Sequence, residues 1–362
     1  MKNIVYYSRM FQSVHHLAEI QKQTGGTFIT TRSSTLKAFR NLHPEFRSAK
    51  CSKIPVSSGN YILNKADQVI TGSLYASTMK KLDAWKAMTF HGTYAWLTPA
   101  VVGKLASFDH LFLIGPRMKQ MLERHLTTTP KFTYEVSGFL PFGSYSEKPT
   151  HSKEILFETK FTDPTLPLIL YAPTSWKVGS FREWALHLAT NIPAGCNLLI
   201  RPHPRIAIKG GKDQRALLQQ LLIMTKPTQN LALDLNEFDA NELYAHTNLV
   251  ISDANSTAEE SLFYDCPQLL IETDQWSRNR LIERAQQDQI HPADIKQLAT
   301  VFDLGPTLNA KNKHKTTDII SNTLSSIDQY KETRKEYFHW VFGSKKTDAA
   351  NNASKTILTT AP

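Results

Sequence analysis

The sequence predicts an α/β protein of two domains, each built on a parallel sheet. Short apolar runs of strand length alternate with helical patterns along most of the chain, as in parallel sheets with crossover helices. The 362 residues exceed what one hydrophobic core usually serves, so two domains are expected. The 41% hydrophobic and 20% charged content is that of an ordinary globular protein.

The first domain is expected over residues 1–145. Its opening strand is the run Ile-Val-Tyr-Tyr at 4–7, and a helix over 15–23 follows, ended by Gly25-Gly26. Apolar or β-prone runs predict further strands at 27–30, 66–70, 87–90, 111–114 and 134–136. Gly115-Pro116 introduces a helix over 117–125. Residues 32–55 are basic and too weakly patterned to be assigned.

A polar, interrupted stretch at 146–164 is the expected linker to a second domain, over 165–315. Strands are predicted there at 166–171, 197–200, 231–233, 249–251 and 269–271, and helices at 181–190, 215–224, 237–246 and 258–264. Residues 316–342 have the pattern of one or two further helices. The tail 343–362, rich in Asn, Ala, Ser, Thr and Lys, is expected to be disordered.

Positive charge is concentrated in the first domain. Residues 1–150 hold 19 Lys and Arg against 8 Asp and Glu, a balance of +11, whereas the remainder holds 23 against 24, a balance of −1. The basic residues include Lys37, Arg40, Arg47, Lys50, Lys53, Lys80, Lys81 and Lys86. Such a one-sided field suits an anionic membrane surface or polymer, the alternative being a basic face kept for solubility. No basic motif interleaved with aromatic residues is found, so a nucleic-acid partner is not expected.

The sequence favours a cytoplasmic location without a bound metal. No run approaches the roughly 20 apolar residues of a spanning helix, and the first residues become polar too early for a signal peptide. Three scattered cysteines, Cys51, Cys196 and Cys266, lack the paired spacing of a zinc site and are typical of a reducing compartment. No metal or cofactor is therefore expected.

Three polar turns follow apolar strands and carry the candidate chemistry. They are His91-Gly92-Thr93, Arg201-Pro202-His203-Pro204 and the stretch 253–257. A histidine can take the proton of an attacking hydroxyl, and a histidine beside an arginine can hold phosphate oxygens. Ser256 or Thr257 is predicted to cap a helix whose unpaired N–H groups would bind phosphate. Each turn alone is also compatible with an ordinary structural role. Together they indicate a phosphate-handling cleft at the carboxyl ends of the strands.

Four segments resemble, in order and approximate spacing, the signatures of the CDP-glycerol glycerophosphotransferase family. The segments are FHGT at 90–93, LYAPTSWK at 170–177, LLIRPHP at 198–204 and ISDANSTAEESLFYDCPQLLI at 251–271. That family contains teichoic-acid primases and polymerases, with relatives in capsule synthesis. The resemblance covers roughly residues 86–275. It implies a GT-B fold of two Rossmann-like domains facing a central cleft, with C-terminal helices that cross back to the first domain.

The resemblance also implies roles for individual residues. His91 would serve the acceptor hydroxyl, with Gly92 and Thr93 on the acceptor side, and His203 would lie at the donor phosphates. The family segment D-Y-S-S reads Asp253-Ala254-Asn255-Ser256 here, so two of its positions have changed and the donor stays open. The remaining candidates on the donor side are Thr174, Arg201, Thr257 and Glu260, with Glu259 an equal candidate for the ribose contact.

The resulting hypothesis is a transferase at the inner face of the cytoplasmic membrane. It would move glycerol phosphate, or a related alditol phosphate, from a CDP-linked donor to a hydroxyl of a cell-surface glycan or lipid-linked acceptor. One alternative is a GT-B glycosyltransferase that uses a nucleotide sugar. Another is a non-catalytic, nucleotide-binding scaffold of a capsule-assembly complex. An epimerase is disfavoured, because no set of cleft acids is evident.

Overall fold

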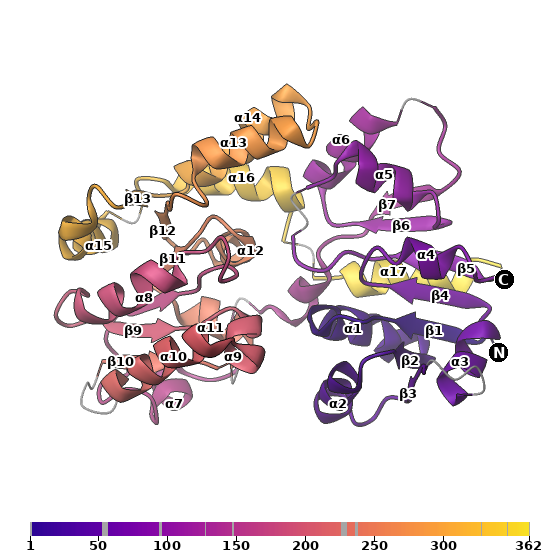
Figure 1. Ribbon diagram of the computed structural model, residues 1–362, viewed down its shortest axis with the longest axis horizontal. Helices are drawn as coiled ribbons and strands as arrows, with labels where there is room; N and C mark the ends of the chain where they lie inside the picture. Colours follow the sequence, from indigo (N-terminus) through magenta and orange to yellow (C-terminus); the bar gives the residue numbers. More distant parts are fainter. Residues whose placement is uncertain are drawn as a thin grey trace. The chain divides into compact units, whose positions relative to one another are not determined.

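The computed structural model describes residues 2–52, 57–93, 96–126, 128–146, 148–225, 230–235, 238–326, 328–345 and 347–361, so Lys53 and Glu237 lie outside it. The chain forms two compact units (Figure 1). Unit 1 contains Met1–Ser144, Asp288–His291 and His339–Pro362. Unit 2 contains Tyr145–Gln287 and Pro292–Phe338.

Unit 1 is built on a seven-stranded parallel sheet in the order β3-β2-β1-β4-β5-β6-β7. Its strands are β1 Ile4–Tyr7, β2 Thr27–Thr30, β3 Ser48–Lys50, β4 Gln68–Thr71, β5 Trp85–Met88, β6 His110–Leu113 and β7 Thr133–Val136. The order reverses between β1 and β4, which pair in register with Tyr7 opposite Thr71. Both strands are buried along their length, as expected for a sheet covered on both faces.

Helices cover the sheet of unit 1 on both faces (Figure 1). They are α1 Val14–Thr24, α2 Ser33–Leu42, α3 Ser58–Asn64, α4 Ala76–Met79, α5 Pro99–Leu105, α6 Pro116–His125 and α17 Ala349–Thr359, with short 3₁₀ turns η1 Phe11–Ser13 and η2 Leu140–Ser144. In the core, strand residues such as Tyr6 and Phe28 pack with side chains from the helices. Phe28 stacks on Phe39 of α2, with ring centroids 4.1 Å apart.

The expectation of a disordered C-terminal tail is wrong. Helix α17 packs on α1, and its residues Ala349, Ala350, Ala353 and Ile357 belong to the core of unit 1. The side-chain amide of Gln68 also donates to the carbonyl of Ile357 at 3.0 Å. The prediction failed because an apolar stripe made chiefly of alanine resembles a low-complexity tail, although alanine is the strongest helix former.

Unit 2 is built on a six-stranded parallel sheet in the order β10-β9-β8-β11-β12-β13. Its strands are β8 Leu168–Tyr171, β9 Asn197–Ile200, β10 Leu231–Leu233, β11 Leu249–Ser252, β12 Gln268–Ile271 and β13 Thr307–Leu308. Here the order reverses between β8 and β11. Tyr171 of β8 lies opposite Ile200 on one side and Ile251 on the other, so the three strands end together.

The helices of unit 2 bury a second core. They are α7 Lys153–Phe157, α8 Phe181–Thr190, α9 Pro204–Lys209, α10 Lys212–Thr225, α11 Ala240–His246, α12 Ser256–Glu260, α13 Arg278–Gln287, α14 Pro292–Ala299, α15 Thr316–Ser325 and α16 Lys331–Phe342, with η3 Ser261–Tyr264, η4 Thr300–Asp303 and η5 Lys313–Lys315. Trp184 of α8 and Leu221 of α10 pack against β8 and β9 in that core.

The domain boundaries differ from the expected ones. The predicted linker contains α7, whose Phe157 is completely buried within unit 2 whereas Ile155 is exposed. The chain returns to unit 1 twice, at Asp288–His291 and within α16, which belongs to unit 1 from His339 onward. The unassigned stretch 32–55 contains α2 and β3.

Candidate functional site

In unit 2, the predicted donor-side residues lie in turns that follow three adjacent strands. Arg201 follows β9, Thr174 follows β8, and Asp253 follows β11. In a parallel sheet the crevice at the strand-order reversal is the usual ligand site, and the reversal here lies between β8 and β11. Two hydrogen bonds join the turns after β8 and β11. The Thr174 N–H donates to Asp253 Oδ2 at 2.7 Å, and Asn255 Nδ2 donates to the Ala172 carbonyl at 3.1 Å.

Asp253 holds the loop that follows β8. Its side chain is only 1% exposed, and Oδ2 accepts the N–H of Thr174 and, at 3.1 Å, the N–H of Ser180. Burial raises the pKa of this carboxyl to about 6, against the lowering effect of these hydrogen bonds. A Cβ on Gly179 would lie 2.7 Å from Oδ2, so the loop closes tightly on the carboxylate. Asp253 is therefore a positioning residue, which acts through the loop carrying Thr174.

The helix after β11 begins differently from the prediction. Asn255, not Ser256 or Thr257, is the N-cap, because its Oδ1 accepts the N–H groups of Thr257 and Ala258 at 3.0 and 3.3 Å. Ala254 before it has a left-handed φ of 50°, which turns the chain into the cap. The α-helix is also short, since it passes into a 3₁₀ turn after Glu260.

The cap changes how this turn can bind phosphate. Two of the N–H groups expected to be unpaired are already satisfied by Asn255. The Thr257 side chain is hydrogen-bonded to the Tyr244 hydroxyl. The turn therefore offers a phosphate fewer open N–H groups than the sequence indicated.

Arg201 and His203 present donors from the turn after β9. Arg201 Nη1 donates to Asp234 Oδ2 and to the Phe238 carbonyl, both at 2.9 Å, and Asp234 is fully buried. This ion pair fixes the guanidinium, and the described residues give its Nε and Nη2 groups no partner. His203 caps α9, where its Nδ1 accepts the Arg205 N–H at 3.2 Å. Nδ1 thus carries no proton, and the neutral ring has its proton on Nε2 as a donor.

Burial and the charge of Arg205 lower the pKa of His203. The ring is therefore neutral at physiological pH, with Nδ1 committed to the backbone. A neutral Nε2–H group beside a fixed guanidinium can hold phosphate oxygens by directed hydrogen bonds. The location of His203 at the donor phosphates stays a prediction.

The two adjacent glutamates of α12 have different surroundings. Glu259 is 4% exposed and accepts a hydrogen bond from the Tyr337 hydroxyl at 2.7 Å. Glu260 is half-buried near Arg201 and is hydrogen-bonded to Tyr145. Burial, followed by the charge of Glu259, raises the pKa of Glu260 to about 8. The carboxyl is therefore protonated at neutral pH and can both donate to and accept from a ribose hydroxyl, which favours Glu260 over Glu259.

Tyr145 and Tyr244 enclose this carboxyl group but were not predicted from the sequence. Burial raises the pKa of both hydroxyls, and the charge of Glu260 raises it further. Their ring centroids are 6.3 Å apart. Tyr145 is the last residue of the expected first domain, and Tyr244 lies on a helix that was predicted only from its apolar spacing. No sequence motif marks either tyrosine as a residue of the site.

In unit 1, His91 follows β5 and is held by the turn after β4. Its Nδ1 lies 2.7 Å from the Gly72 carbonyl and 2.8 Å from Ser73 Oγ. A carbonyl can only accept, so Nδ1 carries the proton and Nε2 keeps its lone pair. Burial lowers the pKa of His91, which keeps the ring neutral. This is the tautomer that a general base for a hydroxyl requires.

The neighbours of His91 have structural roles. Gly92 has a φ of 58°, in the left-handed region that glycine tolerates. Thr93 is 3% exposed, and its carbonyl accepts from Arg117 Nη2 at 2.8 Å. Arg117 is itself buried and its guanidinium lies 5.5 Å from the ring centre of Trp340. Gly92 and Thr93 therefore shape the turn. The sequence did not predict Ser73 or Arg117 as its supports, because neither follows a recognisable motif.

The described part of the chain contains no group of three or more His, Cys, Asp or Glu side chains able to hold a metal ion. None of its helices is long and apolar enough to cross a bilayer. The three cysteines are buried and free.

No protein-family model and no curated protein matches the chain. Several solved structures share its fold. The wall teichoic acid polymerase TagF, in a structure soaked with CDPG, is 15% identical, with a TM-score of 0.65 over 99% of this chain and 88% of that one. Anabaena Alr3699/HepE, in complex with UDP and glucose, is 9% identical, with a TM-score of 0.58 over 99% and 100%. Sucrose-phosphate synthase from Thermosynechococcus elongatus is 12% identical, with a TM-score of 0.55 over 99% and 98%.

At such low identity these likenesses show the fold alone. They confirm a GT-B-like fold of two parallel α/β domains, as the sequence predicted.

Proposed function

We propose that this protein transfers glycerol phosphate, or a related alditol phosphate, from a CDP-linked donor to a hydroxyl of a glycan or lipid-linked acceptor. The observation that carries the proposal is the opposite tautomers of its two motif histidines. His91 keeps its proton on Nδ1 and offers Nε2 as a base, whereas His203 keeps Nδ1 as an acceptor and offers Nε2–H as a donor. One ring suits proton removal, and the other suits a phosphate oxygen.

The donor half of the reaction is assigned to unit 2. Arg201 and His203 would hold the pyrophosphate, with Ser256 as a further contact, and Glu260 would contact the ribose. The ion pair of Arg201 with buried Asp234 keeps the guanidinium in place without solvent reorganisation. Asp253 supports the same site by holding the loop of Thr174.

In the proposed reaction, the acceptor oxygen attacks the β-phosphorus of the donor. The bond from that phosphorus to the bridging oxygen breaks, CMP leaves, and a phosphodiester to glycerol forms. The proton of the acceptor hydroxyl passes to His91 Nε2, a step that typically accelerates such reactions by roughly 10²–10⁴. Arg201 and His203 would compensate the negative charge that grows on the departing CMP.

A second candidate is sugar transfer from a nucleotide sugar. It is favoured by Asn255, whose cap occupies two N–H groups at the turn where the family segment has a serine. The similar fold of HepE, whose structure contains UDP and glucose, agrees with it. The acceptor-side chemistry at His91 would differ, because attack would occur at carbon.

A donor panel tests the proposal. CDP-glycerol, CDP-ribitol and common UDP-sugars are each offered with a crude membrane fraction as acceptor, and the released nucleotide is identified. Release from CDP-glycerol or CDP-ribitol by the wild type, lost in His91→Gln, supports the proposal. Release of UDP from a sugar donor would replace it with the second candidate. Nucleotide binding without turnover of any donor would point to the scaffold.

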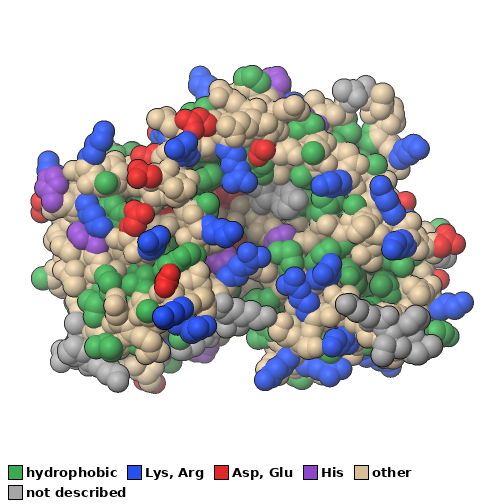
Figure 2. Space-filling model, viewed as in Figure 1, with side chains coloured by type: hydrophobic (Ala, Val, Ile, Leu, Met, Phe, Trp, Pro, Cys, Tyr) green, Lys and Arg blue, Asp and Glu red, His purple; other side chains and the backbone are tan. Residues whose placement is uncertain are grey.

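Peripheral membrane attachment is a separate part of the proposal. Lys37, Arg40, Arg47, Lys50 and Lys80 are all exposed on unit 1, and Figure 2 shows Lys and Arg side chains spread over the face drawn. Binding to vesicles that contain phosphatidylglycerol should weaken steeply as salt rises. Binding that is insensitive to salt would remove the electrostatic part of the proposal.

A further inference from the structure

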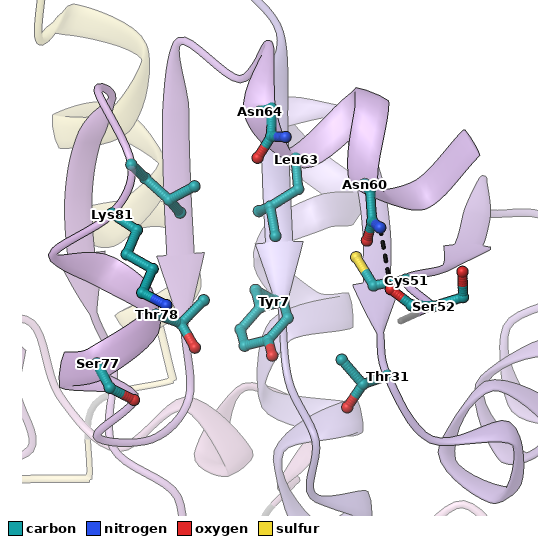
Figure 3. A pocket seen from close by; sticks show the side chains of 11 residues that line it. Tyr7, Thr31, Cys51, Ser52, Asn60, Leu63, Asn64, Ser77, Thr78 and Lys81 are labelled. Carbon is teal, nitrogen blue, oxygen red and sulfur yellow. Dashed lines mark hydrogen bonds between the residues drawn. The ribbon is translucent and has the colours of Figure 1, made fainter. Parts of the chain in front are cut away.

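Unit 1 contains a cavity that none of the roles above uses. Its volume is about 330 Å³, near the lower end of ligand pockets (Figure 3). It lies at the carboxyl ends of neighbouring strands, with Tyr7 ending β1, Thr31 following β2 and Cys51 following β3. Side chains of α3 and of the α4 region complete its walls. This edge of a doubly wound sheet is where such folds bind ligands.

The wall formed by α3 is firmly placed. Gly59 lets that helix approach β3, since a Cβ there would lie 2.4 Å from the carbonyl carbon of Lys50. Ser57 caps the helix by accepting the Asn60 N–H. Asn60 Nδ2 donates to the Ser52 carbonyl at 2.9 Å, which fixes the amide at the cavity (Figure 3). The site is therefore built before a ligand arrives.

The lining has the chemistry of a site for a small anionic polyol. Among the described residues, those that line the cavity carry hydroxyl and amide side chains and one charged group, Lys81, and none of them is Asp or Glu. Lys81 is exposed, and the described residues provide no ion-pair or hydrogen-bond partner for its ammonium group. In Figure 3 its side chain runs toward Thr78 and Tyr7. Hydroxyl and amide groups match the alternating donors and acceptors of a polyol, and an unneutralised ammonium matches a phosphate.

The floor of the cavity is chemically inert. Tyr7 is 3% exposed and hydrogen-bonded to the Thr78 side chain, and burial raises the pKa of its hydroxyl. Burial also raises the pKa of the Cys51 thiol to about 11, so the sulfur stays protonated. A thiolate nucleophile is therefore not expected, and the cavity is suited to binding.

One loop connects this cavity to His91. The segment after β4 supplies Ser73, whose Oγ lies 2.8 Å from His91 Nδ1, and a few residues later it supplies Thr78 to the cavity. Between them, Tyr75 makes an edge contact with Tyr7, with ring centroids 5.2 Å apart. A ligand in the cavity would contact the same loop that orients the proposed base.

We propose that this cavity binds a small phosphorylated polyol or sugar, with its phosphate at Lys81 and its hydroxyls at Thr78, Asn60 and Tyr7. The inference rests on the proposed function in one respect, that the ligand is the phosphate-bearing end of the acceptor. That end would be held in unit 1, separately from the donor phosphates in unit 2.

The test uses sn-glycerol 3-phosphate as the probe, with the full-length protein and no nucleotide present. Calorimetry should show tighter binding of glycerol 3-phosphate than of glycerol or inorganic phosphate. Lys81→Met should weaken that binding by about tenfold or more, because a charge-assisted contact is lost. Lys80→Met is the matched control, since Lys80 is the adjacent exposed lysine and does not line the cavity; it should bind as the wild type does.

Equal weakening by the two variants, or no binding of glycerol 3-phosphate by the wild type, would overturn the inference. Its failure can be told apart from failure of the proposed function. Release of CMP from CDP-glycerol by a protein that does not bind glycerol 3-phosphate would leave the function standing and remove the cavity's role. Binding of glycerol 3-phosphate at Lys81 without turnover of a CDP-linked donor would leave the cavity's role standing and remove the proposed function.

Discussion

Asp253→Asn should remove a pH-dependent destabilisation of unit 2. The pKa of this carboxyl is raised from 3.8 to about 6 by burial, so the native state favours the protonated form. Its contribution to stability is therefore full below pH 3.8 and is lost as the pH rises through 6. The whole shift corresponds to about 3 kcal/mol, of which nearly half is lost between about pH 5 and about pH 7. Asparagine does not titrate, so the free energy of unfolding of the variant lacks this pH-dependent contribution.

Hydrogen exchange of the backbone amides in β8 and β11 measures this effect, because both strands lie in the buried core of unit 2. The ratio of wild-type to variant exchange rates cancels the intrinsic pH dependence of exchange. That ratio should be about tenfold higher at about pH 7 than at about pH 5, since about 1.4 kcal/mol is a factor of ten. An identical ratio at both pH values would refute the assignment of a raised pKa to Asp253.

Three further predictions concern the turns of the candidate site. His91→Gln should lower kcat by roughly 10²–10⁴ while the Kd for CDP stays near the wild-type value. Because burial lowers the pKa of His91, the wild-type rate should decline on the acidic side with a midpoint below pH 6.5. A midpoint above pH 6.5 would contradict the assignment of His91 as the base. Gly179→Ala should destabilise unit 2 by about 1–3 kcal/mol, because the Cβ of the alanine would lie 2.7 Å from Asp253 Oδ2 and 2.8 Å from the Thr174 carbonyl. An unfolding midpoint at the same denaturant concentration as the wild type would argue against this tight loop. Asn255→Ala should cost about 1 kcal/mol or more of stability through loss of the N-cap and of the bond to the Ala172 carbonyl, whereas Asn255→Ser, which keeps a capping oxygen, should lose less; equal loss in both would exclude capping.

The strand pattern was predictable where apolar runs are buried on both faces. The predicted strand at 197–200 and the predicted helix at 181–190 match β9 and α8. Burial of both sheet faces makes such strands apolar throughout, so the pattern is visible without partners. Helix α17 was missed because its buried face is alanine, and α2 because its apolar residues are interrupted by basic ones.

The candidate site was predictable as residue types in turns, but not in its hydrogen bonding. The motif around His203 gave its position, whereas its tautomer depends on the Arg205 N–H, which only the fold supplies. Likewise, nothing in the sequence distinguishes Asn255 as the cap from Ser256, since both residue types favour that position. Partners distant along the chain, such as Tyr337 at Glu259, carry no local pattern at all.

The central claim is that the acceptor attacks phosphorus, and the identity of the nucleotide released from CDP-glycerol tests it most directly. Attack at the β-phosphorus breaks the bond to the bridging oxygen and must release CMP. Attack at the glycerol carbon would break the carbon–oxygen bond and release CDP. With a competent acceptor, we expect CMP in an amount equal to the glycerol phosphate transferred. CDP as the released nucleotide, or UDP release confined to sugar donors, would contradict the claim.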